Sequence, residues 1–74
     1  MTNVELKMII GKNIKKYRIM RDLTQEELAN LIGCTTPLIG ALESSKMYQG
    51  ISVYNLYKIS KVLNISIEKF FEEK

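Results

Sequence analysis

The chain has no histidine, one cysteine and one proline in 74 residues. Cys34 has no second thiol with which to form an internal disulfide, and without histidine there is no ligand set for zinc. Nor does the sequence offer the side chain that most often serves as a general acid or base near neutral pH. These absences argue against a disulfide-stapled, metal-binding or histidine-dependent protein, and they favour a reducing, cytoplasmic setting.

Long apolar runs are also missing. No run approaches the length needed to cross a bilayer, and the first residues, "MTNVELKMIIGKNIKK", lack the basic-then-apolar order of a secretion signal. We therefore expect a protein that neither enters a membrane nor is exported. The length allows one domain, residues 1–74, with one modest core, but leaves little room for a catalytic cleft and its supporting shells.

Catalytic constellations are equally scarce. Ser44, Ser45 and Lys46 could suggest a serine–lysine nucleophile, but adjacent side chains at a helix end normally diverge, and no third group is placed to orient them. The sequence contains no phosphate-cradling glycine-rich loop. We expect no enzymatic activity, no cofactor, no metal and no small-molecule ligand.

Charge is present but unevenly distributed. The formal net charge is +3, yet the charged residues are separated by sign along the chain. Those of residues 1–21 are mostly basic, those of 22–45 are all acidic, and those of 46–61 are all lysines. Such separation can create a basic surface on a chain that is only mildly basic overall.

The N-terminal part has helical periodicity over residues 4–21, because apolar side chains recur at steps of three and four. Lys12, Lys15, Lys16 and Arg18 lie between them, and most of these cations are expected on a solvated face. The predicted core stripe consists of Leu6, Ile9 or Ile10, Ile14, Tyr17 and Met20 or Arg21.

The segment "LTQEELANLIG" predicts a second helix over 25–32. Thr24 and Glu27 form a capping box, and Gly33 supplies a left-handed stop. Two residues later Thr35 can cap a third helix, 36–44, whose first turn accommodates Pro37. Two short helices joined by a tight turn that contains glycine define a helix-turn-helix. The predicted inward residues are Leu28, Leu31 and Ile32, followed by Leu38 or Ile39 and Leu42.

Two further helices complete an expected all-α fold of five helices. Ser52 caps a helix over 53–63 that Asn64 closes, and Ser66 caps a short final helix over 67–74. The predicted inward residues of the helix over 53–63 are Val53, Leu56, Ile59, Val62 and Leu63, and the apolar residues of the final helix are Ile67, Phe70 and Phe71.

The segments "IGKNIKKYRIMRDLTQEELANLIG", "LIGALE" and "LYKISKVLNISIEKFF" resemble the phage-repressor and Cro-like (XRE) helix-turn-helix family. The resemblance covers about residues 10–71. It implies a lambda-repressor-like fold in which the second helix lies across the DNA backbone and the third enters the major groove. The expected function is sequence-specific transcriptional regulation, such as repression, by a homodimer on an inverted repeat.

The resemblance also implies roles for individual residues. Gln25 matches a glutamine that contacts phosphate in the family, and Arg18 and Glu43 match an ion pair that ties the first helix to the third. Both members of that pair adjoin core positions, so each would need a partner if buried. The positions expected to face base edges are Thr36, Pro37, Gly40 and Ala41.

Two departures from the family pattern stand out. Asp22 replaces a glycine where the chain leaves the first helix, although aspartate tolerates left-handed geometry better than most residues. The predicted third helix also has no Arg, Lys, Asn or Gln, the residues that pair bidentately with guanine or adenine. We therefore expect readout by the Thr36 hydroxyl, by apolar contact with thymine methyls and by DNA shape, giving a site rich in A and T.

Affinity can come from phosphate contacts, which release counterions whatever the sequence. Lys46 matches a segment that runs along the DNA backbone in the family, although this loop is one residue longer than the common form. For Tyr48, packing of the ring on the loop is as good an explanation as a phosphate contact. The phosphate-contact candidates are Gln25, Ser44, Ser45, Lys46, Tyr48 and Gln49.

In the family, the C-terminal helix often supplies the dimer contact. The dimer candidates here are Ile65, Ile67, Phe70 and Phe71, of which at least half are expected to close the core instead; Ile67 and Phe71 are the pair expected to be exposed. The alternative function is a protein-interaction module, antitoxin-like or antirepressor-like, that has lost specific DNA binding. Its docking patch would be Pro37, Leu38 and Ala41. Salt-dependent DNA binding would separate the two functions.

Overall fold

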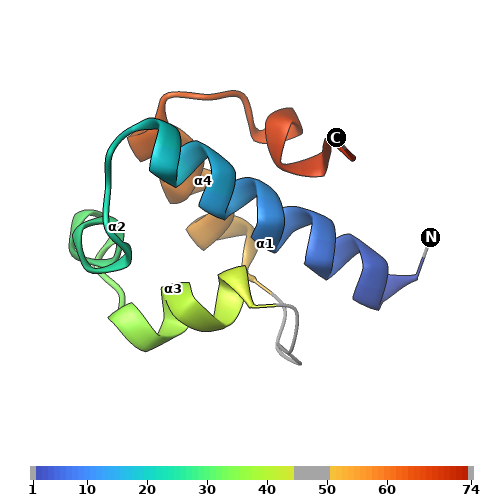
Figure 1. Cartoon of the computed structure of the whole chain (residues 1–74), viewed down its shortest axis with the longest axis horizontal. Coiled ribbons are helices and arrows are strands. Elements are labelled where there is room, and N and C mark those ends of the chain that lie inside the picture. Colours follow the sequence, from blue (N-terminus) through green and yellow to red (C-terminus); the bar gives the residue numbers. More distant parts are fainter. Residues whose placement is uncertain (1, 45–50, 74) are drawn as a thin grey trace.

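The computed structural model describes residues 2–44 and 51–73. Within these ranges the chain forms four α-helices and one short 3-10 helix, with no strand (Figure 1). The elements are α1 (Asn3–Met20), α2 (Gln25–Ile32), α3 (Thr36–Glu43), α4 (Val53–Leu63) and η1 (Ile67–Phe71).

Each α-helix starts at a threonine or serine whose hydroxyl accepts a hydrogen bond from a backbone amide of the first turn. The predicted caps Thr24, Thr35 and Ser52 are confirmed. Thr2 forms a further capping box with Glu5, which explains why α1 begins before residue 4. Local side-chain chemistry therefore determines where the helices begin.

Three residues adopt the left-handed backbone conformation at or just after the end of a helix, as the sequence predicts. Gly33 closes α2 with φ of 75°, and Asn64 closes α4 with φ of 55°. Asp22, in the connection from α1 to α2, has φ of 56°. Aspartate and asparagine adopt this region more readily than other side chains, so the absence of glycine at position 22 is tolerated.

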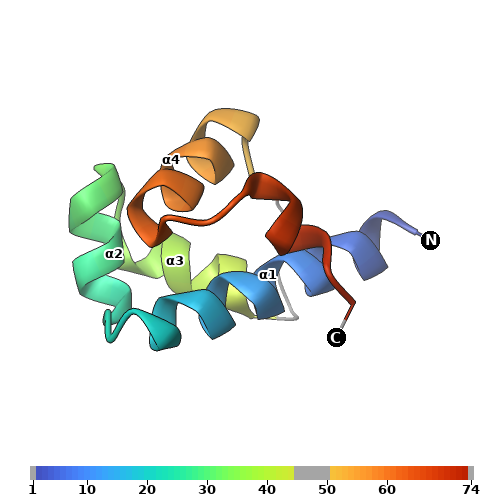
Figure 2. The same cartoon turned by 90° about the horizontal axis from the view of Figure 1, so that it is seen from above.

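The helices pack around a core that lies between α1 and the other elements. α1 runs along one side of the molecule, η1 packs against it, and α2 packs between α3 and α4 (Figures 1 and 2). Gly11 is buried where α1 meets α3, and a Cβ there would overlap the carbonyl oxygen of Leu42. The buried apolar residues are Ile10, Ile14, Leu28, Ala29, Ile32, Ile39, Leu42, Leu56, Ile59, Leu63 and Phe70.

Three residues predicted to point inward are exposed instead. Met20 is 65% exposed, Leu31 60% and Val53 78%. On α1 the buried face is centred on Ile10, Ile14 and Arg18, so Met20 at the last position rotates outward. On α2 the inward positions are Leu28, Ala29 and Ile32, and Val53 precedes Leu56, where burial of α4 begins.

The predicted fifth α-helix is wrong in type and length, because the segment forms the 3-10 helix η1. Ser66 caps the amide of Glu68 only two residues on, and the chain is already extended at Glu72. The side chain of Asn13 donates to the carbonyl oxygens of Phe70 and Glu72 at 2.8 and 2.7 Å. These carbonyls thus have partners on α1, which removes the need for a longer helix to satisfy them.

Candidate nucleic-acid interface

The helix-turn-helix consists of α2, the turn at residues 33–35, and α3. Cys34 in the turn is half-buried, and burial raises the pKa of its thiol, an effect that nearby Lys58 opposes only in part. Lys58 also donates to the carbonyl oxygen of Ile32 at 2.7 Å, satisfying a free acceptor at the end of α2. The thiol is therefore a packed side chain of the turn.

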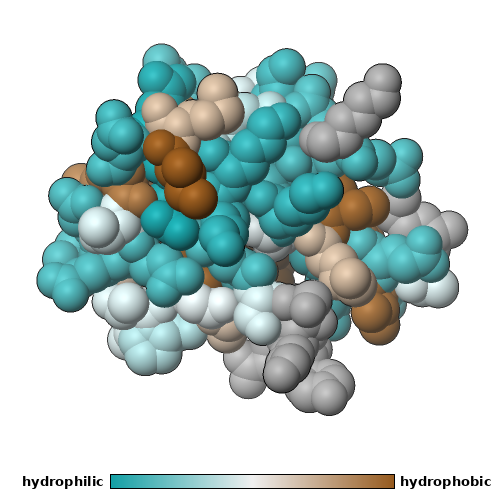
Figure 3. Space-filling model, viewed as in Figure 1, coloured by the Kyte–Doolittle hydropathy of each residue, from teal (hydrophilic) through white to brown (hydrophobic). Residues whose placement is uncertain are grey.

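The outer face of α3 carries the four residues expected to face base edges. Pro37 and Ala41 are exposed, and Thr36 and Gly40 are half-buried. The opposite face of the helix is anchored in the core by the buried residues Ile39 and Leu42. In Figure 3 the surface over α3 is pale, neither strongly hydrophilic nor strongly hydrophobic. The helix therefore presents a small, uncharged surface that could approach another molecule closely.

The predicted ion pair between Arg18 and Glu43 is present and buried. Arg18 Nε and Nη2 donate to the two carboxylate oxygens of Glu43 at 2.7 and 3.0 Å, and the two side chains are 10% and 3% exposed. Arg18 Nη1 also donates to the carbonyl oxygen of Leu23 at 2.6 Å. This bidentate pair links α1 to the C-terminal end of α3 and to the connection before α2.

Gln25 has a protein contact that sequence reasoning missed. Its Nε2 donates to Glu43 Oε1 at 3.1 Å, and its Oε1 lies 3.6 Å from the position that a Cβ would occupy on Gly40. The family pattern places this residue at the start of α2 but carries no information about a bond to the far end of α3. Glu43 therefore accepts hydrogen bonds from both α1 and α2.

Most other phosphate-contact candidates lie in the loop after α3. Ser44 is exposed and caps α3, its backbone amide bonding to the carbonyl oxygens of Gly40 and Ala41. The remaining loop candidates lie outside the described residues: Ser45, Lys46, Tyr48 and Gln49.

Of the four dimer candidates, one is contradicted by burial. Phe70 is fully buried in the core, so it is not available to a second copy. Phe71 is 44% exposed, whereas Ile65 and Ile67 are half-buried against the core. Because η1 is a tight 3-10 helix held by Asn13, Phe70 turns inward while its neighbour remains at the surface.

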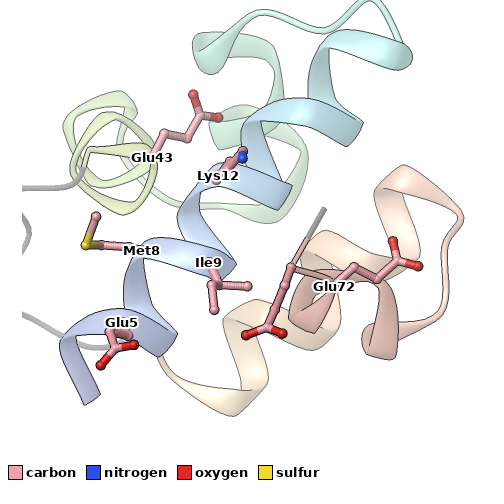
Figure 4. A pocket seen from close by; sticks show the side chains of 7 residues that line it. Glu5, Met8, Ile9, Lys12, Glu43 and Glu72 are labelled. Atoms are coloured by element: carbon pink, nitrogen blue, oxygen red, sulfur yellow. The ribbon is translucent and has the colours of Figure 1, made fainter. Parts of the chain in front are cut away.

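A shallow groove of about 440 Å³ lies beside the N-terminal half of α1. It is lined by Met8, Ile9 and Lys12 together with four glutamates, Glu5, Glu43, Glu72 and Glu73 (Figure 4). Carboxylates repel phosphate groups, so the groove is unsuited to the DNA backbone. Among the described residues there is no group of three or more side chains that could hold a metal ion.

A comparison with known families identifies the fold. Residues 14–70 match the model of the helix-turn-helix family HTH_3. The chain belongs to this helix-turn-helix family. The match includes α2, α3 and α4 in full, as well as the part of α1 that holds Arg18. In the described part of the chain, no helix is both long and apolar enough to span a bilayer.

Two proteins similar to this helix-turn-helix chain are named as a control protein and a controller protein. This chain is 30% identical over 66 residues to the control protein C.SmaI of Serratia marcescens. The aligned residues cover 89% of this chain and 76% of that protein. Its fold superimposes on the restriction-modification controller C.AhdI of Aeromonas hydrophila with a TM-score of 0.79 and 26% identity, over 88% of this chain and 96% of the other. Both similarities extend over nearly the whole chain.

A third similarity is to a structure solved with nucleic acid. SinR, described as a master regulator for biofilm formation and crystallised in complex with DNA, has a TM-score of 0.76 and 28% identity. The similarity covers 85% of this chain and 98% of that one.

Proposed function

We propose that this protein is a DNA-binding transcription regulator that acts as a homodimer on an inverted-repeat operator. Membership of the helix-turn-helix family supports the regulatory role. The observation that carries the mode of binding is the geometry of α3, because Ile39 and Leu42 anchor it while Thr36, Pro37, Gly40 and Ala41 face outward. In this arrangement α3 enters the major groove and α2 lies across the backbone.

Sequence recognition in this proposal is of an unusual kind, since α3 lacks the side chains that read bases bidentately. The Thr36 hydroxyl can donate or accept, and Pro37 and Ala41 can contact thymine methyl groups. Small side chains allow the helix to approach the base edges, so groove shape contributes to preference. We expect an operator rich in A and T and only moderate discrimination between sites.

Affinity then depends on the DNA backbone. Free amides at the start of α2 and the loop residues Ser44, Ser45, Lys46, Tyr48 and Gln49 are the proposed phosphate contacts. Gln25 donates a hydrogen bond to Glu43, and this contact does not support a role for Gln25 in phosphate binding.

Two copies would bind more tightly than one because the second half-site is then held at high effective concentration. The half-sites would lie about 34 Å apart, one turn of the double helix. We assign the dimer contact to Phe71 with support from Ile65 and Ile67, since Phe71 is the large apolar side chain of η1 that remains exposed. Residues 1–74 would act as one domain in the cytoplasm without catalytic activity, in a phage, restriction-modification or other operon.

The test is binding of the whole chain to a complete inverted repeat and to a single half-site, with stoichiometry measured by analytical ultracentrifugation. The proposal expects two copies on the complete repeat and binding at least about tenfold tighter than to the half-site. Phe71→Ser should reduce that advantage, while the matched variant Leu31→Ser, which alters an exposed leucine on α2, should not. One copy per repeat with equal affinities would contradict the dimer.

The alternative, a protein-interaction module without specific DNA binding, is favoured by the uncharged outer face of α3. Its proposed docking patch is Pro37, Leu38 and Ala41, but Leu38 is half-buried against the core, which leaves a smaller apolar surface. Absence of any salt-dependent DNA binding would favour this function over the first.

A further inference from the structure

α3 contributes no side-chain amide or guanidinium to the proposed DNA-facing surface. The nearest such group comes from another helix. Gln25 is the first residue of α2, and its Oε1 lies 3.6 Å from the Cβ position of Gly40. Among the described residues, no other atom outside α3 and the neighbours of Gly40 lies within 4 Å of that position. The carboxamide of Gln25 therefore lies beside Gly40, at ordinary van der Waals distance from the position of a Cβ there.

The orientation of this carboxamide is fixed by Glu43. The buried carboxylate of Glu43 is paired with Arg18, and a carboxylate in such a pair accepts hydrogen bonds but donates none. The group of Gln25 that faces Glu43 at 3.1 Å must therefore be the amide nitrogen. The oxygen is turned the other way, toward Gly40.

We infer that Gln25 is a specificity-determining residue whose Oε1 accepts a hydrogen bond from the amino group of an adenine or a cytosine opposite Gly40. The inference rests on the proposed function, because it requires α3 to lie in the major groove. Adenine N6 and cytosine N4 are the donors that bases display there. Gln25 thereby supplies α3 with the polar contact that its own sequence lacks.

This role differs from the phosphate contact that the family resemblance implies. A phosphate oxygen accepts hydrogen bonds only, so an acceptor oxygen facing the DNA backbone would be repelled rather than bound. Glu43 acts as a positioning residue, since its bond to Nε2 determines which end of the amide is presented. Gly40 contributes by having no side chain in the way.

The experiment is selection from a pool of randomised duplexes with the whole protein, Gln25→Met and Gln25→Lys. Methionine keeps the approximate length without a polar amide, and lysine adds a cation suited to phosphate. We expect the unmodified protein to enrich a motif with A or C at one position of each half-site. Both variants should lose preference at that position alone, with roughly 2- to 10-fold weaker binding to the original motif.

A base analogue tests the same contact from the DNA side. If the preferred base is adenine, it is replaced by unsubstituted purine, an analogue that lacks the N6 amino group. If the preferred base is cytosine, it is replaced by an analogue that lacks the N4 amino group. The analogue should weaken the unmodified protein but leave Gln25→Met unchanged. Gly40→Leu, which places a larger side chain beside the carboxamide, should alter preference at the same base pair and provides an independent variant should Gln25→Met fold poorly.

Several results would overturn the inference. Uniform weakening by Gln25→Met with an unchanged motif, or tighter binding by Gln25→Lys to every sequence with the motif retained, would make Gln25 a phosphate contact. An effect of Gly40→Leu confined to a different base pair would show that Gln25 and Gly40 do not face the same base pair, which contradicts the inference. In these cases the proposed function would stand, whereas failure of the unmodified protein to enrich any motif would overturn both.

Discussion

Asn13 connects α1 to the C-terminal segment from inside the core. It is 1% exposed, and its side-chain amide donates to two carbonyl oxygens, those of Phe70 and Glu72. Both carbonyls would lose a partner if the amide were removed, and an unsatisfied buried polar group is costlier than the hydrogen bond itself contributes. The residue therefore determines how η1 is held and which phenylalanine enters the core.

Replacing Asn13 by leucine should lower the free energy of unfolding by about 2–4 kcal/mol, because two acceptors remain unpaired. The measurement is urea denaturation, followed by circular dichroism. Lys15→Leu is the matched control, since Lys15 is exposed two residues away on the same helix, and it should change stability by no more than about 0.5 kcal/mol. Equal effects of the two substitutions would contradict the role of Asn13.

Individual contacts of this kind are where the sequence is least informative. A lone asparagine between Lys12 and Ile14 has no periodicity that distinguishes a buried position from an exposed one, and its partners are 57 and 59 residues away. The bond between Gln25 and Glu43 escaped prediction for the same reason, because it depends on how α2 and α3 pack. Arg18 and Glu43 were predictable only because a family pattern and their core-adjacent positions pointed to the same pair.

At the scale of elements, the sequence predicts more. The boundaries of α2 and the start of α4 follow from caps and left-handed stops, each of which is a local property of a few neighbouring residues. η1 was predicted as an α-helix because its residues fit that pattern, but tertiary bonds from Asn13 changed its form. The core face of α1 was placed correctly at its centre and wrongly at its end, where no neighbouring element covers Met20.

The contact between α1 and α3 depends on Gly11. Gly11→Ala should lower the free energy of unfolding by about 1–3 kcal/mol, despite the better helix propensity of alanine, because the new methyl group overlaps the carbonyl oxygen of Leu42. Thermal and urea unfolding measure the change. Any displacement of α3 should also weaken DNA binding.

Gly40→Ala is the matched control for Gly11→Ala. A Cβ at Gly40 would make an ordinary contact of 3.6 Å with Gln25 Oε1, so the substitution should be neutral or stabilising by up to about 1 kcal/mol. If Gly11→Ala stabilised the protein to the same extent, close packing of α1 on α3 would be contradicted.

For the molecule as a whole, a second polar contact, in addition to that of Asn13, joins α1 to the chain beyond η1. The hydroxyl of Tyr17 donates to Glu72 Oε1 at 2.6 Å, and this bond lowers the pKa of Glu72 and raises the pKa of Tyr17. For the carboxyl group, the favourable contribution is present above its unfolded pKa of about 4.3 and is lost as pH falls through the lower folded value. For the phenol, it is present below its unfolded pKa of about 10 and is lost as pH rises through the raised folded value.

Tyr17→Phe should therefore be less stable than the unmodified protein at neutral pH, and the difference should shrink in acid as Glu72 becomes protonated. Urea denaturation between about pH 7 and pH 3 measures this trend. Tyr57→Phe is a control because Tyr57 lies on the exposed side of α4. A stability difference that stays constant down to the lowest pH would contradict the contact.

DNA recognition by an uncharged α3 is tested most directly by fluorescence anisotropy at two salt concentrations. The duplexes are the inverted repeats upstream of the protein's own coding sequence and a randomised pool of the same length. We predict tighter binding to the native repeat at both concentrations, with affinity for both duplexes falling as salt rises. Equal affinity for the two duplexes, or no binding even at low salt, would contradict specific regulation by this helix-turn-helix.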